Sequence, residues 1–202
     1  VGALCQQAFP VADNRNLVVA AAAAVGDTRV SVTMGAAALV ANYYRDGFLH
    51  INAGAGPGHL YKVRGHAAIA ASGTGWFELY DKIRVALTTS SRATLTKHPA
   101  DAVIISPSPA TGAVAGVTPI AVTANYYFWL QVKGVCAVLT EGTLVAGKSV
   151  VPSTGTVDGA VGPPTLTEGT PNTGFDQPFV GTVLQVNATT THSLIDLSIP
   201  GY

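Results

Sequence analysis

Residues 28–33 read TRVSVT, with a valine at every second position and polar or charged side chains between them. Successive side chains of a β-strand point to opposite faces, so this alternation predicts a strand with one buried face. Similar patterns predict further strands at 48–52, 61–65, 76–80, 84–88, 103–105, 120–123, 128–132, 136–139, 183–186 and 193–197. No amphipathic helix of useful length is expected after residue 40. The predicted class is therefore all-β, an antiparallel barrel or sandwich of jelly-roll type.

The division of the chain follows the distribution of glycine and proline. Residues 1–33, with an Ala-rich run and few β patterns, are expected to form an extended N-terminal arm. Residues 34–202 are expected to form the β-rich body, with a Pro- and Gly-rich connector near 106–118 that would join two lobes. The tetrapeptide Ala-Asn-Tyr-Tyr occurs at 41–44 and again at 124–127, which would fit two related β halves.

Charge is scarce in this chain. Eleven basic and eleven acidic residues cancel, and charged residues make up only 11% of the sequence, against about 25% in an average globular domain. A surface with so little charge is expected to be covered by other copies of the chain or by a partner. Nucleic acid is not expected as the partner, because phosphate binding relies on clustered Lys and Arg. No membrane partner is expected either, since the longest apolar run, 17–25, is far shorter than the ~20 residues of a membrane helix.

The cysteines and histidines do not form a recognisable metal motif. Cys5 and Cys136 are too few for a disulfide framework and are expected to be two separate thiols. The five histidines lack the H-E-x-x-H pattern, and neither cysteine lies in a CxxC pair. Neither a metal nor another cofactor is therefore expected.

One segment matches a nucleotide-binding motif. Residues 142–149, GTLVAGKS, fit G-x-x-x-x-G-K-[ST]. The motif works only where a helix begins at its Lys-Ser end, because the helix N-terminus supplies aligned N–H groups to the phosphates. The residues that follow, Val150-Val151-Pro152, favour a strand or a turn. We therefore expect a turn between two strands and keep a P-loop nucleotide hydrolase as the least favoured function.

Two other candidate sites are weaker. The run 54–58, GAGPG, matches only part of a dinucleotide loop and is expected to be a turn between strands. His192, Ser193 and Asp196 are the residue types of a hydrolytic triad, but on one strand Ser193 would face away from the other two. The chain is therefore not expected to be an enzyme.

Aromatic side chains gather in three short segments, 43–44, 76–80 and 126–129. Rings of this kind could stack on sugars or bases. They occur more often in cores and subunit interfaces, and the sequence shows no cluster of basic residues beside them. A core or interface role is therefore the favoured interpretation.

Several segments resemble the capsid decoration, or cement, proteins of tailed bacteriophages. The resemblance lies in residues 41–49, 80–91, 124–131, 134–139, 186–190 and 193–195. It implies a β-rich virion protein on the outer surface of an assembled head, often a homotrimer, that stabilises contacts between major capsid subunits. The alternative is a phage tail or fibre protein with a β-sandwich.

Under this interpretation, contact residues are expected in the presumed arm and in the two Pro-rich loops. The candidates are Leu17, Val18, Val19, Val25, Pro107, Pro109, Pro163, Pro164, Phe175 and Phe179. The expected partners are two further copies of the chain and the phage major capsid protein.

Overall fold

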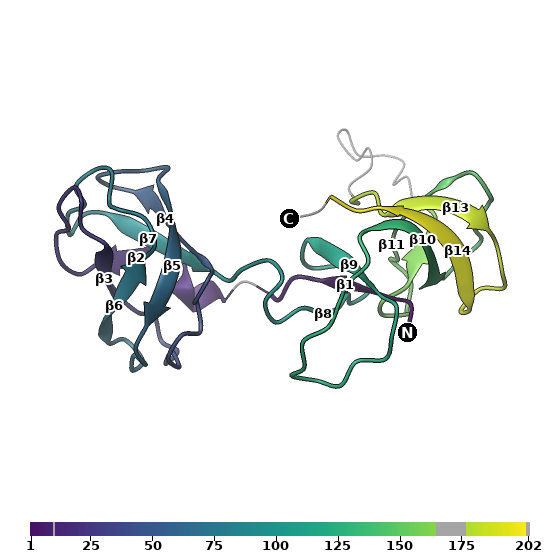
Figure 1. The fold of residues 1–202 in the computed structure, drawn as a ribbon, viewed down its shortest axis with the longest axis horizontal. Coiled ribbons are helices and arrows are strands. Elements are labelled where there is room, and N and C mark those ends of the chain that lie inside the picture. The colour runs from purple at the N-terminus through teal and green to yellow at the C-terminus, as the bar shows by residue number, and fades with distance from the viewer. Residues whose placement is uncertain (10, 165–176, 201–202) are drawn as a thin grey trace. The chain divides into compact units, whose positions relative to one another are not determined.

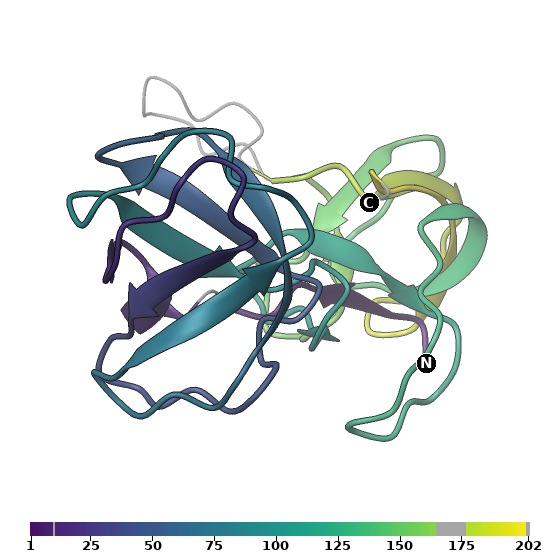
Figure 2. The ribbon, with the colours of Figure 1, turned by 60° about the vertical axis from the view of Figure 1, so that its left-hand side comes forward.

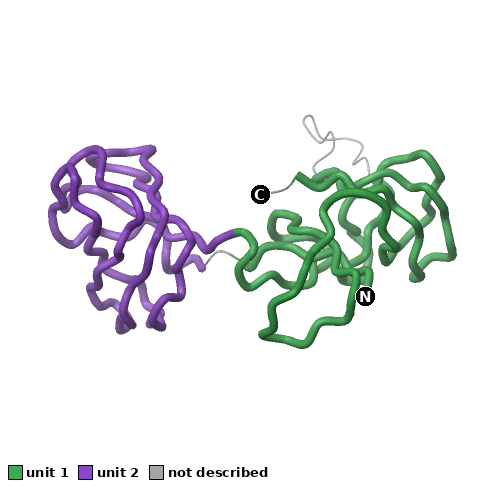
Figure 3. The backbone as a smooth tube through the Cα atoms, viewed as in Figure 1, with its two compact units in different colours: residues 1–9, 99–202 green, residues 10–98 purple. Residues whose placement is uncertain are grey.

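The computed structural model describes residues 1–9, 11–164 and 177–200 of the chain. It consists of two compact units, shown in Figure 3: unit 1 contains Val1–Phe9 and Pro99–Tyr202, and unit 2 contains Pro10–His98. The described residues hold strands and one short 3₁₀ helix, η1 (Ala12–Asn14). All strand pairs are antiparallel apart from one isolated bridge. The predicted all-β class, an antiparallel barrel or sandwich, is confirmed.

Unit 2 is a closed six-stranded barrel in the order β2-β3-β6-β5-β4-β7 (Figures 1 and 2). Its strands are β2 (Leu17–Val19), β3 (Arg29–Thr33), β4 (Phe48–Ala53), β5 (Leu60–His66), β6 (Thr74–Leu79) and β7 (Arg92–Thr96). The barrel closes because the short strand β2 pairs with β3 on one side and with β7 on the other. Closure leaves no sheet edge open to unintended pairing.

The core of the barrel follows from the alternation in its strands. Val30 and Val32 of β3, and Phe77 of β6, are completely buried. Their neighbours Arg29, Trp76 and Glu78 point outward and are exposed. The inward side chains form one cluster that also includes Leu49, Ile51, Tyr61, Val63, Ala93 and Leu95. Burial of such side chains, worth about 1.5–3 kcal/mol each, is the main force that holds the barrel together.

The run GAGPG forms the turn between β4 and β5, as predicted. Gly54 has φ of +80°, a conformation that side-chain-bearing residues rarely adopt. A Cβ at this position would also collide with the backbone carbonyl oxygen of Ser90. Glycine is therefore required here for the backbone itself, which explains this segment without a phosphate ligand.

Unit 1 contains two sheets (green in Figure 3). The first has the order β8-β1-β9, with β1 (Ala3–Gln6), β8 (Ile104–Ile105) and β9 (Val114–Thr118). The second has the order β10-β14-β13-β11-β12, with β10 (Lys133–Leu139), β11 (Ser149–Pro152), β12 (Val161–Gly162), β13 (Gly181–Gln185) and β14 (His192–Ser198). Leu4 of the first sheet and Val138, Val150, Val183 and Ile195 of the second belong to one buried cluster.

Unit 1 is discontinuous in sequence, because β1 precedes the barrel and all its other strands follow it. The predicted N-terminal arm over 1–33 is therefore wrong. Residues 3–6 form the central strand of a sheet, and residues 17–19 and 29–33 are barrel strands. The strand over 29–33 follows the alternation predicted from the sequence, whereas the two shorter strands, over 3–6 and 17–19, were not predicted because they are too short to show a clear alternation.

The predicted connector at 106–118 is also wrong, because these residues lie inside unit 1 and the unit boundaries fall at 9/10 and 98/99. The buried side chain of Gln6 holds this segment against β1. Its Oε1 accepts hydrogen bonds from the N–H groups of Thr111 and Gly112 at 3.0 and 3.2 Å. Its Nε2 donates to Thr111 Oγ1 at 2.9 Å.

Three predicted strands, 84–88, 120–123 and 128–132, are not strands in the structure. Each has strand-like residues but pairs with a neighbour at no more than an isolated bridge. The repeated Ala-Asn-Tyr-Tyr marks a similar turn in both copies, since Asn42 and Asn125 both have positive φ, at 60° and 66°. However, the two units differ in sheet topology, so the repeat does not reflect two related halves.

Candidate functional site

The most unusual surface in unit 1 is a long loop between β9 and β10, which we call the apolar loop (residues 119–130; teal-green in Figure 1). Two hydrogen bonds close its base: the N–H of Val117 donates to the carbonyl oxygen of Gln131 at 2.9 Å, and the N–H of Gln131 donates back at 2.8 Å. Residues 113–132 contain no charged side chain. The apolar loop thus carries no charged side chain, and its two ends are held together by backbone hydrogen bonds.

The apolar loop exposes aromatic side chains to solvent. Tyr127 and Trp129 are 106% and 87% exposed, and Tyr126, Ile120 and Val122 are exposed as well. Each large ring can bury about 150–250 Å² in a contact. Contiguous exposed apolar surface of this kind marks an interaction site in a soluble protein. Sequence analysis predicted strands in this loop and did not include it among the contact residues.

A second apolar surface lies at an edge of the first sheet. Among the described strands, β8 pairs only with β1, and both residues of β8, Ile104 and Ile105, are exposed. A short apolar edge strand offers side chains and unpaired backbone groups to a partner. Unit 1 therefore carries two surfaces suited to protein contacts.

The predicted contact residues differ in their exposure to solvent. Leu17 and Val19 lie in the core of the barrel, so they are unavailable to a partner and this part of the prediction is wrong. The error arose because the apolar run at 17–25 was interpreted as an arm, whereas residues 17–19 form strand β2 and alternate side chains of this strand enter the barrel core. The remaining candidates in the described residues are exposed or half-buried: Val18, Val25, Pro107, Pro109, Pro163, Pro164 and Phe179. Phe175 lies outside the described residues.

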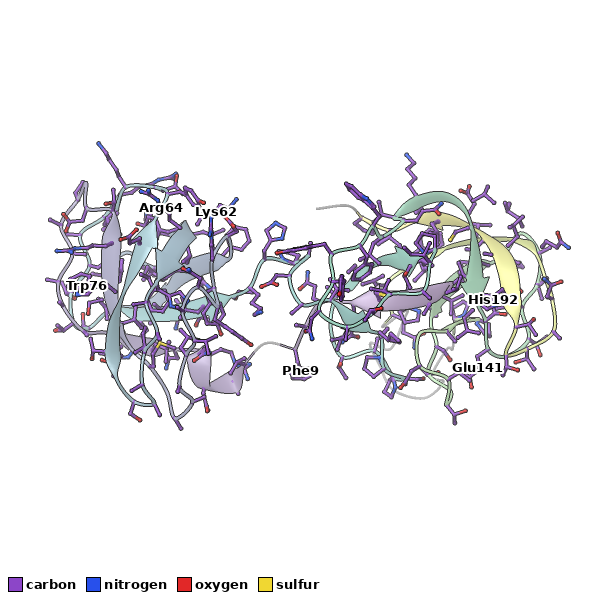
Figure 4. All side chains as sticks on the ribbon, turned by 60° about the horizontal axis from the view of Figure 1, so that its bottom comes forward. Phe9, Lys62, Arg64, Trp76, Glu141 and His192 are labelled. Atoms are coloured by element: carbon purple, nitrogen blue, oxygen red, sulfur yellow. The ribbon has the colours of Figure 1, made fainter. Side chains whose placement is uncertain are left out.

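The side chains of the three aromatic segments have different surroundings. Tyr44 and Phe77 are buried in the barrel core, and burial raises the pKa of Tyr44 to about 12. Trp76 and Tyr80 lie on the outside of the barrel, and Trp76 is labelled in Figure 4. The segment 126–129 belongs to the apolar loop. The core part of the predicted core or interface role thus holds for Tyr44 and Phe77, whereas an interface role for the exposed rings stays a prediction.

The nucleotide-binding motif does not adopt the geometry it needs. Strand β11 begins at Ser149, where a P-loop protein would begin a helix. The N–H groups of Gly142, Gly147 and Lys148 are already bonded to Thr189 Oγ1, Val183 O and Val145 O. They are therefore not aligned toward a common phosphate, and the segment is a turn between two strands, as expected.

The triad-like residues of β14 do not converge. Ser193 is buried, and its hydroxyl lies 3.3 Å from Thr140 Oγ1 and accepts the N–H of Asn187 at 3.0 Å. His192, labelled in Figure 4, is exposed and its Nε2 lies 2.9 Å from the carbonyl oxygen of Val1. As predicted, Ser193 faces away from His192 and Asp196.

Both cysteines are free and buried, in agreement with the expectation of two separate thiols. Burial raises the pKa of Cys5 to about 11 and raises that of Cys136 as well. In the described part of the chain, no group of three His, Cys, Asp or Glu side chains could hold a metal ion. Across those same ranges, no helix has the length and apolar character needed to cross a bilayer.

Among the carboxylates of unit 1 that the structure describes, Glu141 has the most strongly shifted pKa, and it is labelled in Figure 4. It accepts hydrogen bonds from Ser153 Oγ at 2.6 Å and from the N–H groups of Thr156 and Val157 at 2.8 and 3.2 Å. These bonds, led by that from Ser153, lower its pKa to about 2. The carboxylate is saturated by its own chain, so its role is to fix the turn at 153–157.

Comparison with protein-family models, curated proteins and solved structures finds no match for this chain. The function is therefore argued from the geometry of its surfaces. The apolar loop is the candidate functional site in unit 1, because Tyr126, Tyr127 and Trp129 remain exposed to solvent among the residues that the structure describes.

Proposed function

We propose that the protein is a virion structural protein of the capsid decoration, or cement, type. It binds the outer surface of an assembled phage head as a homotrimer and stabilises contacts between major capsid subunits. The observation that carries the proposal is the apolar loop, whose exposed Tyr126, Tyr127 and Trp129 extend from a hydrogen-bonded base. The resemblance of residues 41–49 and 124–131 to decoration proteins gives the class of partner.

The energetics support a contact of this kind. Burial of a large apolar side chain is worth about 1.5–3 kcal/mol. Aromatic anchors at the centre of an interface commonly carry most of its binding energy. The loop also carries no charged side chain, so its burial would not require the desolvation of a charge. Three neighbouring rings can therefore hold a subunit on a lattice of repeated partners.

The overall composition is consistent with such a role. Net charge is zero and only 11% of residues are charged. Stable assembly interfaces are depleted of charge at their centres. Many copies side by side on a shell would also repel one another if each carried a large net charge.

The experiment compares the wild type with Tyr127→Ser/Trp129→Ser. We expect the double variant to keep its thermal stability, because both side chains are exposed, and to lose co-sedimentation with expanded phage heads that lack the protein. A matched control, Leu60→Ser/Val85→Ser, removes two exposed apolar side chains from the barrel instead. Light scattering during size-exclusion chromatography reports whether each variant still forms trimers.

The results distinguish the alternatives. Loss of head binding only in the loop variant supports the proposal. Head binding by the loop variant at wild-type strength would show that the apolar loop is not the contact. A wild-type protein that sediments with purified tails and not with heads would favour the tail or fibre alternative.

A further inference from the structure

The barrel unit has a groove on its outer surface that is distinct from the apolar loop. Its volume is about 680 Å³, and its lining includes Arg29, Arg45, Arg64, Asn42, Trp76 and Glu78. Pockets of about 300–1,000 Å³ are typical of small-molecule and oligosaccharide-sized ligands. All the lining residues belong to unit 2, so the groove is formed by one rigid fold.

Strand register brings the basic residues of the groove together, although they are far apart in sequence. Arg29 of β3 lies directly opposite Glu78 of β6, and β5 pairs with the other side of β6. The register of β5 shifts between Val63 and Gly65, so Arg64 is an extra residue at a bulge. Bulges commonly redirect a side chain next to a binding site. Figure 4 labels Arg64 and Trp76 on the barrel.

Trp76 holds Arg29 in a defined position. The guanidinium carbon of Arg29 lies 4.5 Å from the centre of the Trp76 ring. A guanidinium held over an aromatic face can still offer N–H groups to an oxyanion. The groove thus presents a positioned cation rather than a flexible one.

The arginines of the groove have unused binding capacity. Neither Arg29 nor Arg64 forms an ion pair with any residue that the structure describes, although Glu78 lies opposite Arg29. The Nε atom of Arg45 lies 3.7 Å from Oδ2 of Asp46, and both side chains are largely exposed to solvent. A guanidinium bonds a carboxylate or sulfate through two parallel N–H groups. Two guanidinium groups are therefore available for an anionic ligand.

The other lining groups suit a sugar. Trp76 and Tyr80 are 45% and 52% exposed. Arg29 lies over the Trp76 ring and Lys62 Nζ lies 5.6 Å from the centre of the Tyr80 ring, so a sugar ring would contact the part of each aromatic ring that these cations leave exposed. Asn42 accepts the N–H of His66 at 3.2 Å through its Oδ1, so its NH₂ group remains available as a donor. A Cβ at Gly65 would lie 2.9 Å from that Oδ1, so glycine makes room for the amide. Glu78 can accept hydrogen bonds from hydroxyl groups.

We propose that this groove binds an acidic oligosaccharide, with a carboxylate or sulfate of the sugar held by Arg29 and Arg64 and a ring packed against the exposed aromatics. A nucleic acid fits less well, because a polyphosphate needs a continuous row of cations. Here the acidic side chain of Glu78 lines the groove together with the basic groups, and the chain has no net charge. A sugar uses the same acidic groups as hydroxyl acceptors.

The experiment uses the full chain with Trp129→Phe, so that Trp76 is the remaining tryptophan and its fluorescence reports on the groove. The probes are a hyaluronan hexasaccharide (carboxylates), a heparin hexasaccharide (sulfates and carboxylates), chitohexaose (uncharged) and an oligothymidylate of similar length. We expect saturable binding of at least one acidic sugar, no binding of chitohexaose, and weaker binding as salt screens the charges.

Matched variants test the residues. Arg29→Ala and Arg64→Ala are each expected to weaken binding at least about tenfold, as expected for loss of a charge-assisted hydrogen-bonded pair. Arg15→Ala removes an exposed arginine of the same unit outside the groove and is expected to have no effect. The proposal is overturned by no binding of either acidic sugar, by equal binding in the groove variants, or by preferential binding of the oligothymidylate.

Discussion

The Nε2 atom of His66 accepts a hydrogen bond from the backbone N–H of Tyr44 at 3.1 Å. This bond requires an unprotonated Nε2, so the ring proton of the neutral imidazole is on Nδ1, which donates to the carbonyl oxygen of Ala67 at 2.8 Å. The ring also packs against Phe77, with centroids 4.7 Å apart. One neutral tautomer of His66 therefore ties β5 to the turn that carries Tyr44.

This geometry predicts pH-dependent stability of the barrel. Burial lowers the pKa of His66 below its usual 6.5, although the bond to Ala67 opposes this shift. The unfolded chain therefore takes up the proton first as the pH falls. The contribution of His66 is fully present above 6.5 and is lost as the pH falls through the lower pKa of the folded state.

Urea unfolding at about pH 7.5 and about pH 5 measures this effect in the full chain. We expect a lower free energy of unfolding for the barrel at the acidic value. His66→Gln should reduce this difference, whereas His50→Gln, on β4, should leave it unchanged. Equal pH dependence in His66→Gln and the wild type would contradict the prediction.

Glu141 predicts an acid-sensitive turn in unit 1. Its pKa is lowered from 4.5 to about 2, chiefly by the hydrogen bond from Ser153. The contribution of this carboxylate is therefore present above 4.5 and is lost as the pH falls through about 2. Glu141→Gln should weaken the pH dependence of unit 1 stability over this interval, followed by circular dichroism during thermal unfolding.

Two further variants sharpen this measurement. A Cβ at Gly155 would collide with the Glu141 carboxylate, so Gly155→Ala should displace this carboxylate. The variant should then show a reduced pH dependence of unit 1 stability, as Glu141→Gln does. Asp196→Asn removes an exposed carboxylate of β14 and should change little. If Asp196→Asn altered the acid transition as much as Glu141→Gln, the assignment to this turn would be wrong.

The strands that sequence predicted correctly are those with clear alternation. Residues 29–33 of the segment TRVSVT form β3, and Val30 and Val32 both enter the barrel core. This strand could be predicted because its alternation is visible without knowing which strand it pairs with. Segments 120–123 and 128–132 have the same residue types, but they lie in and beside a loop whose base is closed by Val117 and Gln131. Composition alone does not show whether a segment finds a partner strand.

The sites were harder to predict than the fold class, because they depend on register. Arg29 and Arg64 are 35 residues apart in sequence, and only the pairing of β3, β6 and β5 brings them to one groove. The sequence therefore shows no basic cluster near Trp76 and Tyr80, although the fold brings one there. The sequence also could not show that Tyr127 is exposed and Tyr44 is buried, because the two residues occupy the same position in the two copies of Ala-Asn-Tyr-Tyr.

Gln6 predicts a large stability effect from one buried amide. Its side chain is fully buried and bonds Thr111 and Gly112 of the 106–112 segment. Gln6→Leu would remove the acceptor of two partly buried backbone N–H groups, at a cost of about 1–3 kcal/mol in the free energy of unfolding of unit 1. Urea unfolding measures this loss. Gln185→Leu, at an exposed position of β13, should stay within about 0.5 kcal/mol of the wild type.

The discontinuity of unit 1 predicts how fragments of the chain behave. Residues 10–98 contain all six barrel strands and their core, so they should fold alone. Residues 99–202 lack β1, which lies between β8 and β9 in the first sheet. They therefore also lack Leu4 of β1, a completely buried side chain of the unit 1 core. We expect this fragment to be unfolded alone and to fold when residues 1–9 are fused to its N-terminus through a short Gly-Ser linker. Amide dispersion in NMR spectra of the three fragments measures the outcome. A fragment 99–202 that folds without residues 1–9 would show that β1 is dispensable, and the matched fusion with Leu4→Asp should fail to restore folding because it places a charge in the core.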